Sequence, residues 1–299
     1  MSEHDAGSSA GQDQPGCYRH PDRPALLRCS RCERPVCADD AIEAPVGYQC
    51  RECAAGGQRV RHLGELMPDF TVTKVLVAII AVIYLGTQAD PGTVINTFGL
   101  RPVVAGMGEW WLLVTSGFLH ANLMHVGFNG FLLWRLGEML EPSLGHARFS
   151  ALYAAGLAGG SLGVVALSWL WAVTPLAEIP VLGGVITSDP RIPTIGASGA
   201  VFALMGAAVV GLRNRGVNPW RTDIGTLVLL NLAITFFLPG ISVGGHVGGL
   251  LAGMAVGKLV FVPADQRRRA TVLASLAALA MFGLALGLSY GILEAMLRP

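Results

Sequence analysis

A serine and a histidine in separate apolar segments carry the strongest chemical signal in this sequence. Ser198 lies in Gly196-Ala197-Ser198-Gly199, at the start of an apolar run that continues to residue 212, and His246 lies in a second run over residues 243–262. A histidine within a membrane span is costly, so its default interpretation is functional. The pair predicts a nucleophile, Ser198, and its general base, His246, within a bilayer.

Two further polar residues share one predicted helix and suit the same chemistry. His125 and Asn129 are four residues apart in an apolar segment, so they lie on one helical face. Hydrogen-bond donors near a serine nucleophile stabilise the negative charge that develops on the attacked carbonyl oxygen. The alternative is that these two groups bond each other or a neighbouring helix. His120 is a weaker candidate, which we expect to be a supporting residue that organises the outer loop.

Glycines recur at every fourth residue around His246, at Gly245, Gly249, Gly253 and Gly257. Four residues are close to one helical turn, so these glycines form a stripe that lets another helix approach closely. Gly199 and Ala203 offer small positions beside Ser198. Such a stripe is common in inert membrane proteins too. Here it would bring the serine within hydrogen-bonding reach of the histidine.

Charge is distributed unevenly along the 299 residues. Hydrophobic residues make up 52% of the chain and charged residues 14%, well below the charge content of soluble domains. Of the 41 charged residues, 19 precede Thr71. We therefore expect a small soluble part followed by an all-α polytopic membrane protein. A net charge of +1, without a basic stripe that includes aromatics, predicts no nucleic-acid partner.

Seven apolar segments after Thr71 approach or reach the length needed to cross a lipid bilayer. They cover residues 72–88, 122–140, 149–173, 195–212, 223–238, 243–262 and 272–293. Ten of the thirteen Lys and Arg residues in this part fall on the inner side if the N-terminus is cytoplasmic. This bias predicts a multi-pass cell-membrane protein with its C-terminus outside. Ser198, His246 and His125 then share a depth near the outer face.

Three motifs, taken together and in this order, resemble the rhomboid family of intramembrane serine proteases. They are His125-Val126-Gly127-Phe128-Asn129, Gly196-Ala197-Ser198-Gly199, and His246-Val247-Gly248-Gly249 with Gly253. The resemblance covers about residues 70–262 and implies a six-helix rhomboid core with a Ser–His dyad and no acid. One departure is Trp111-Leu112, where the family often has Trp-Arg in the first outer loop.

The resemblance implies a role for each matched position. Ser198 is the implied nucleophile and His246 the general base and later acid, with no catalytic cofactor. The backbone amide of Ser198 and the side chains of His125 and Asn129 are the implied oxyanion hole. Phe202 matches a position whose ring packs on the catalytic imidazole. The other supporting positions are Gly196, Gly199, Gly249, Gly253 and His120, and Glu141 and Gly145 match a structural turn.

The surroundings of the dyad set further expectations. No carboxylate aligns with His246 in the spans, so we expect packing to orient its ring. Water must reach Ser198 through a polar cavity open to the outside. Substrates are expected to be single-span membrane proteins whose helix unwinds easily near the outer face, because only an extended peptide can be presented to a serine. The short link over residues 239–244 precedes His246 and is a candidate gate.

All six cysteines lie in an N-terminal head, mostly in pairs of candidate ligands with two residues between them. Such pairs are a strong zinc signal, although buried free thiols or disulfides are the alternative. The order resembles B-box or RING-like cross-braced fingers, which implies two structural Zn²⁺ ions. One would be held by Cys17, His20, Cys37 and Asp40, and the other by Cys29, Cys32, Cys50 and Cys53. Asp39 is the alternative to Asp40.

The predicted organisation has five parts. They are a disordered start without a signal peptide (1–16), the finger (17–53), a linker (54–70), the protease core (71–262), and an inner loop with an additional transmembrane helix (263–299). About forty residues are too few for a large core, so metal should supply much of the folding energy of the head. Such fingers usually bind proteins, which suggests a cytosolic protein partner and no part in catalysis.

Three functions fit these observations to different degrees. The first is a membrane-embedded serine endopeptidase. The second is a catalytically inactive rhomboid-like scaffold that binds transmembrane helices, whose usual marker is loss of the serine or the histidine. The third is a transporter or channel with His125 and His246 as a proton relay, which leaves Ser198 in its glycine-rich motif unexplained.

Overall fold

The computed structural model describes residues 15–43, 47–55, 71–175, 179 and 188–298. The chain divides into two compact units, Met1–Asp69 and Phe70–Pro299. The predicted disordered start and linker lie outside the described residues, apart from residues 15–16 and 54–55. Each unit is described here by itself.

The N-terminal unit is built from two short hairpins and one helical turn. Strand β1 (Leu27–Arg28) pairs antiparallel with β2 (Pro35–Val36), β3 (Ile42–Glu43) pairs antiparallel with β4 (Tyr48–Gln49), and α1 covers Arg51–Ala55. Among the residues the structure describes, its buried apolar residues are only Cys17, Cys29, Val36, Cys37 and Cys50. A core of that size cannot offset the conformational entropy of the unit by hydrophobic burial alone.

The second unit is helical, and each of the seven predicted apolar segments overlaps one helix. The helices are α3 (Val72–Thr87), α4 (Pro91–Phe98), α5 (Pro102–Gly106), α6 (Leu112–Thr115), α7 (Leu123–Leu144), α8 (His146–Val173), α10 (Ser198–Asn214), α11 (Asp223–Phe237), α12 (Val243–Val260) and α13 (Arg267–Leu297). The prediction of a mostly helical chain with several apolar helices is confirmed.

Length and apolar composition single out some of these helices as candidate membrane spans. Within the described part of the chain, three segments are long and apolar enough to cross a membrane: His146–Val173, Val243–Val260 and Ala264–Leu297. Three shorter helices, α3, α10 and α11, are also apolar. The number of spans and the direction of the termini stay predictions.

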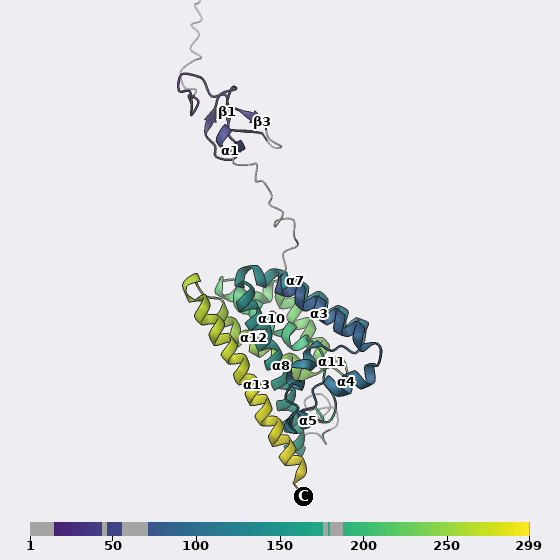
Figure 1. Cartoon of the computed structure of the whole chain (residues 1–299). Coiled ribbons are helices and arrows are strands. Elements are labelled where there is room, and N and C mark those ends of the chain that lie inside the picture. The colour runs from purple at the N-terminus through teal and green to yellow at the C-terminus, as the bar shows by residue number, and fades with distance from the viewer. Residues whose placement is uncertain (1–14, 44–46, 56–70, 176–178, 180–187, 299) are drawn as a thin grey trace, which may run out of the picture. The chain divides into compact units, whose positions relative to one another are not determined.

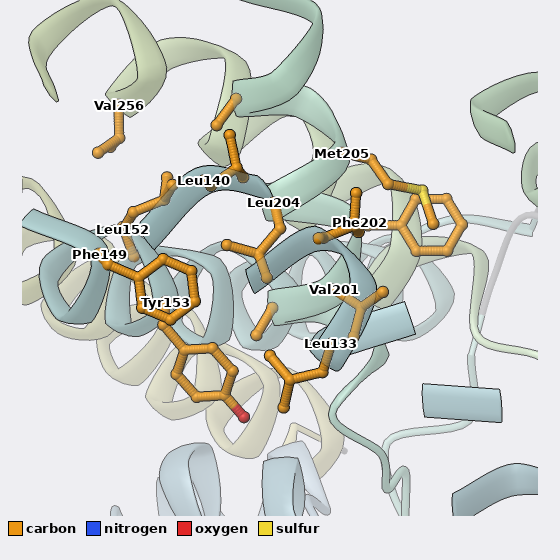
Figure 2. Packing of buried hydrophobic residues seen from close by; sticks show 14 of the residues in the cluster. Leu133, Leu140, Phe149, Leu152, Tyr153, Val201, Phe202, Leu204, Met205 and Val256 are labelled. Carbon is orange, nitrogen blue, oxygen red and sulfur yellow. The ribbon is translucent and has the colours of Figure 1, made fainter. Parts of the chain in front are cut away.

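Helix α8 lies at the centre of the second unit and contacts α10, α12 and α13 (Figure 1). The largest hydrophobic cluster includes Phe149 and Leu152 from α8 together with Leu204 and Met205 from α10, as Figure 2 shows. The long helix α13 buries alanines, among them Ala274 and Ala278, and packs closely along α8. Small side chains on α13 permit this close contact.

The C-terminal end of α7 is tied to the start of α3 by a buried carboxylate. Glu141 is 3% exposed and accepts hydrogen bonds from the backbone amides of Val72, at 2.7 Å, and Thr73, at 2.9 Å. These amides belong to the first turn of α3, which has no intrahelical partners for them. Gly145 follows with a φ of 76° and separates α7 from α8.

The connection over residues 89–111, predicted to lie on the outer side, is more structured than the sequence suggested. It contains α4 and α5, both of which begin with a proline in the first turn. Asp90 caps α4 by accepting a hydrogen bond from the amide of Thr93 at 3.1 Å. Proline at the start of a helix loses no hydrogen bond, so two short helices fit into a segment that hydropathy treats as a loop.

Candidate active site

Ser198 is the first residue of α10 and follows a sharply turned backbone. Gly196 has a φ of 129°, a conformation that L side chains rarely adopt. Its amide donates a hydrogen bond to the carbonyl oxygen of Ser116 at 2.9 Å. A Cβ at position 196 would lie 2.8 Å from Nε2 of His125. Glycine is therefore required there, because both the conformation and the nearby imidazole exclude a side chain.

His246 lies in the first turn of α12, which packs directly on α10. Ser242 caps α12 by accepting a hydrogen bond from the amide of Gly245 at 3.1 Å. A Cβ added at Gly249 would overlap the backbone of Gly199, and one added at Gly253 would overlap the backbone of Ala203. The glycines allow backbone-to-backbone contact between the two helices that carry the serine and the histidine.

Four polar residues predicted for the site line a single cavity of about 470 Å³. Ser198 and His246 come from α10 and α12, and His125 and Asn129 come from α7. The walls also include α8 and α11. The cavity is bordered by Gly240, next to the start of α12, so the link that was predicted as a gate lies at its edge.

The imidazole of His246 is held on two sides. The ring of Phe202, one turn after Ser198, stacks on it with centroids 4.2 Å apart and planes inclined by 21°. In addition, Oγ1 of Thr235 on α11 lies 2.6 Å from Nδ1 of His246. The ring is therefore held by packing, as expected, and also by a hydroxyl, which takes the position that a carboxylate takes in a catalytic triad.

Thr235 was missed in the sequence because the search of the spans was for carboxylates. Its hydroxyl also donates a hydrogen bond to the carbonyl oxygen of Asn231, at 2.7 Å. Asn231 lines the cavity and is 5% exposed. Two buried polar residues four positions apart in an apolar helix were the available signal, the same signal that singled out His125 and Asn129.

The side chain of His125 faces Gly196 with its Nε2 nitrogen. Its Nδ1 accepts a hydrogen bond from the amide of Ala121 at 3.4 Å. A neutral imidazole that accepts at Nδ1 carries its proton on Nε2, so this ring directs an N–H group towards the turn before Ser198. That is the arrangement an oxyanion donor requires.

Asn129 is 5% exposed and donates one amide hydrogen to the carbonyl oxygen of His125, at 3.0 Å. A primary amide has two N–H groups, so the second stays available to a ligand in the cavity. The observed bond is made to the backbone of His125 and not to its imidazole, and it is compatible with a role in the site.

His120 is fully buried behind the same turn. Its Nε2 accepts a hydrogen bond from the amide of Ala197 at 3.4 Å, and its ring meets that of His125 edge to face at 4.8 Å. The residue was predicted to organise the outer loop. It contacts instead the backbone immediately before Ser198, so its described contacts support the turn that leads into α10.

In the head, the eight candidate ligands form two groups of four. These are the same two groups that the resemblance to cross-braced fingers implies. The donor atoms of Cys29, Cys32, Cys50 and Cys53 lie within 4.8 Å of one another, and so do those of Cys17, His20, Cys37 and Asp40. All six thiols are free. The sulfur atoms of Cys32 and Cys50 are 3.8 Å apart. Two thiolates on one tetrahedral Zn²⁺ are about 3.8 Å apart, so the spacing fits zinc.

Asp40, and not Asp39, faces the second group of ligands. One oxygen of Asp40 lies 3.0 Å from Nδ1 of His20, and the other lies 2.9 Å from Nε of Arg51. The carboxylate is 2% exposed, whereas that of Asp39 is 70% exposed and pairs with Arg23. A buried carboxylate with one oxygen held by an arginine presents its other oxygen in a fixed direction.

Electrostatics in the head favour the thiolate at Cys29 but oppose it at Cys53, where side-chain hydrogen bonds with Cys50 and Cys32 raise the pKa to about 12. Burial raises the pKa of the Cys29 thiol, but hydrogen bonds with the backbone of Cys50, Arg31 and Cys32 outweigh this effect and lower the pKa to about 6. A thiol that ionises easily loses its proton to a metal at little cost.

Comparison with known proteins identifies a family domain in this chain. Residues 107–263 match the Rhomboid domain. Rhomboid protease GluP of Bacillus subtilis (strain 168) is 29% identical over 202 residues, which cover 66% of this chain and 36% of GluP. Rhomboid-like protease 1 of Toxoplasma gondii is 29% identical over 219 residues, which cover 67% of this chain and 68% of that protein.

RHOMBOID-like protein 5 of Arabidopsis thaliana is 33% identical over 159 residues, which cover 50% of this chain and 44% of that protein. The chain thus spans between about one third and two thirds of the length of these relatives. The Rhomboid match contains the three motifs with His125, Ser198 and His246 and excludes the cysteine-rich head.

Proposed function

The chain belongs to the rhomboid family, and on that premise we propose that it is an intramembrane serine endopeptidase with Ser198 and His246 as its dyad. The observation that carries the proposal is the single cavity lined by both side chains, although they come from separate helices. The names of GluP and Rhomboid-like protease 1 state a protease activity, which supports the same reaction here.

Acylation would use groups that already line the cavity. Oγ of Ser198 attacks the carbonyl carbon of the scissile peptide bond while Nε2 of His246 takes the hydroxyl proton. The resulting oxyanion accepts hydrogen bonds from the Ser198 amide, Nε2–H of His125 and the free N–H of Asn129. The C–N bond then breaks, and His246 returns the proton to the leaving amine.

Deacylation would repeat these steps with water in place of the serine. His246 takes a proton from water, the hydroxide adds to the ester carbonyl, and the ester C–O bond breaks. Ser198 recovers its proton and the product leaves as a carboxylic acid. The cavity supplies the polar surface that water needs in an otherwise apolar unit, including Ser116, Ser161 and Asn231.

The proposed substrates are single-span membrane proteins cut near the outer face. A transmembrane helix has no free peptide group to present, so helix-breaking residues near the cleavage site lower the cost of unwinding it. The proposed topology is multi-pass in the cell membrane, with a cytoplasmic N-terminus and an external C-terminus. The Lys and Arg bias of the sequence supports that direction.

For the head we propose two structural Zn²⁺ ions that hold a small domain for a cytosolic protein partner. Cys29, Cys32, Cys50 and Cys53 would hold one ion, and Cys17, His20, Cys37 and Asp40 the other. Bound metal would supply the folding free energy that so small a core lacks. The ions have no step in peptide hydrolysis.

A fluorophosphonate probe tests the dyad directly. We expect it to label the detergent-solubilised protein at Ser198, and we expect Ser198→Ala or His246→Ala to remove the label. The matched control is Ser161→Ala, because Ser161 lines the same cavity but donates its hydroxyl to the carbonyl oxygen of Leu113 at 2.6 Å. That variant should still be labelled.

The opposite result separates the enzyme from the scaffold. Wild-type protein that stays unlabelled and cuts no single-span model substrate would refute the enzymatic proposal. It would leave an inactive protein that captures transmembrane helices.

A further inference from the structure

Thr235 on α11 joins the wall of the cavity to the histidine of the proposed dyad. It is 2% exposed, and its Oγ1 atom has two neighbours with which it forms short hydrogen bonds. One is the carbonyl oxygen of Asn231 at 2.7 Å, and the other is Nδ1 of His246 at 2.6 Å. A single hydroxyl thus bridges a backbone oxygen of α11 and the imidazole of α12.

The proton positions in this bridge follow from its chemistry. A threonine hydroxyl has one hydrogen, and a carbonyl oxygen can only accept. The hydroxyl of Thr235 must therefore donate to Asn231, in the bond to the preceding turn that threonine commonly makes within a helix. Its lone pair is then left to accept, so the hydrogen between Thr235 and His246 must come from Nδ1 of the imidazole.

The reverse direction leaves an unfavourable contact. If the Thr235 hydroxyl donated to Nδ1 of His246, two oxygen lone pairs would face each other across 2.7 Å at Asn231. Two oxygen atoms so close together repel each other unless a hydrogen lies between them, so this direction is disfavoured. The side chain of Asn231 cannot relieve this contact, since its amide donates to the carbonyl oxygen of Leu227 at 2.8 Å.

We propose that Thr235 is a positioning residue that holds neutral His246 as the Nδ1–H tautomer and leaves the Nε2 lone pair free to act as the base. This inference rests on the dyad proposed above. Phe202 fixes the plane of the ring by stacking, and Thr235 fixes its rotation within that plane. In a catalytic triad a carboxylate fixes the tautomer of the histidine, and the wrong tautomer lowers kcat by about 10⁴-fold.

Substitution of the hydroxyl tests the role in the full-length protein. Thr235→Val keeps the shape but removes the acceptor, which leaves Nδ1–H unsatisfied, and we expect kcat to fall about ten- to a hundredfold with little change in KM. Thr235→Ser restores the oxygen and should recover most of the activity. The matched control is Thr87→Val, because Thr87 is equally buried and also donates to the preceding turn, at 2.8 Å, but lies on α3.

Nitrogen NMR of the histidine side chains tests the tautomer without any need for turnover. In wild-type protein at about pH 8, where an ordinary imidazole is neutral, we expect His246 to show a protonated Nδ1 and an unprotonated Nε2. Its signals are assigned by comparison with His246→Ala. In Thr235→Val the two tautomers should mix, whereas Thr87→Val should keep the wild-type spectrum.

The outcomes separate this inference from the proposed activity. A protonated Nε2 in the wild type, or Thr235→Val with wild-type kcat and spectrum, overturns the role of Thr235. If the wild type neither cleaves nor reacts with fluorophosphonate, the protease proposal fails, and the NMR spectrum still decides the tautomer. If Thr235→Val does not fold, the wild-type and Thr235→Ser spectra give the answer.

Discussion

Gly249→Ala should separate the serine helix from the histidine helix by a small and calculable distance. A Cβ at position 249 would overlap the carbonyl oxygen of Gly199, and it would lie 2.8 Å from the carbonyl carbon and 2.9 Å from the Cα of that residue. Ordinary contacts begin at 3.4 Å, so relief of the 2.8 Å carbon contact alone requires α12 to move about 0.6 Å away from α10, and relief of the closer oxygen contact requires more. The neighbouring atoms belong to the backbone and cannot rotate aside.

This displacement should be visible in both catalysis and stability. A misplacement of about 1 Å at a catalytic group costs on the order of 10²-fold in rate. We therefore expect kcat for a single-span model substrate to fall roughly ten- to a hundredfold. Overpacking of a helix contact also costs about 1–3 kcal/mol in the free energy of unfolding, which lowers the midpoint of thermal unfolding in detergent.

Gly283→Ala is the control for this experiment. A Cβ at that position of α13 meets nothing within 4 Å. Alanine favours the helix over glycine, so this variant should keep wild-type activity and unfold at the same or a higher temperature. If Gly249→Ala cleaves substrate as fast as Gly283→Ala, the close approach of α10 and α12 has no role in aligning the dyad, and the reasoning is wrong.

Three more outcomes can be measured on the same protein. Metal analysis should return about two zinc ions per chain. Asp40→Ala should lower the number to about one, whereas Asp39→Ala should keep both ions. Equal losses of zinc in the two variants would contradict the choice of Asp40 as the ligand. A chelator should unfold the head while proteolysis continues, and loss of cleavage on metal removal would disprove the separation of zinc from catalysis. Glu141→Gln should destabilise the helical unit by about 1–3 kcal/mol in thermal unfolding, because a buried carboxylate that accepts two backbone amides becomes neutral. Glu138→Gln should have much less effect, because the side chain of Glu138 is 49% exposed and, among the described residues, its only ion pair is with Arg135, at 3.6 Å.

The parts of the structure that depend on local composition were predictable from the sequence. Apolar runs predicted every long helix, because hydropathy reports the length of a segment that is buried in lipid or protein. The glycine spacing around Gly249 predicted a close helix contact, and the spacing of Cys29 and Cys32 predicted a ligand pair. Each of these signals lies within one segment.

The parts that depend on long-range contacts were not predictable in the same way. The predicted apolar segment begins at residue 195, whereas α10 begins at Ser198, because hydropathy does not report the positive φ of Gly196. The bond between Thr235 and His246 joins two helices, and the cap that Glu141 provides for α3 spans 68 positions or more. The spacing of residues within one helix does not indicate which residues of other helices they contact.

The distribution of the proposed centre over α7, α10 and α12 has a consequence for biosynthesis. The base and its tautomer-fixing hydroxyl lie on the two helices that are made after the nucleophile, so a growing chain has no complete hydrolytic apparatus until α12 has docked. Truncated chains that end before α12 would lack the proposed base and would not hydrolyse peptides.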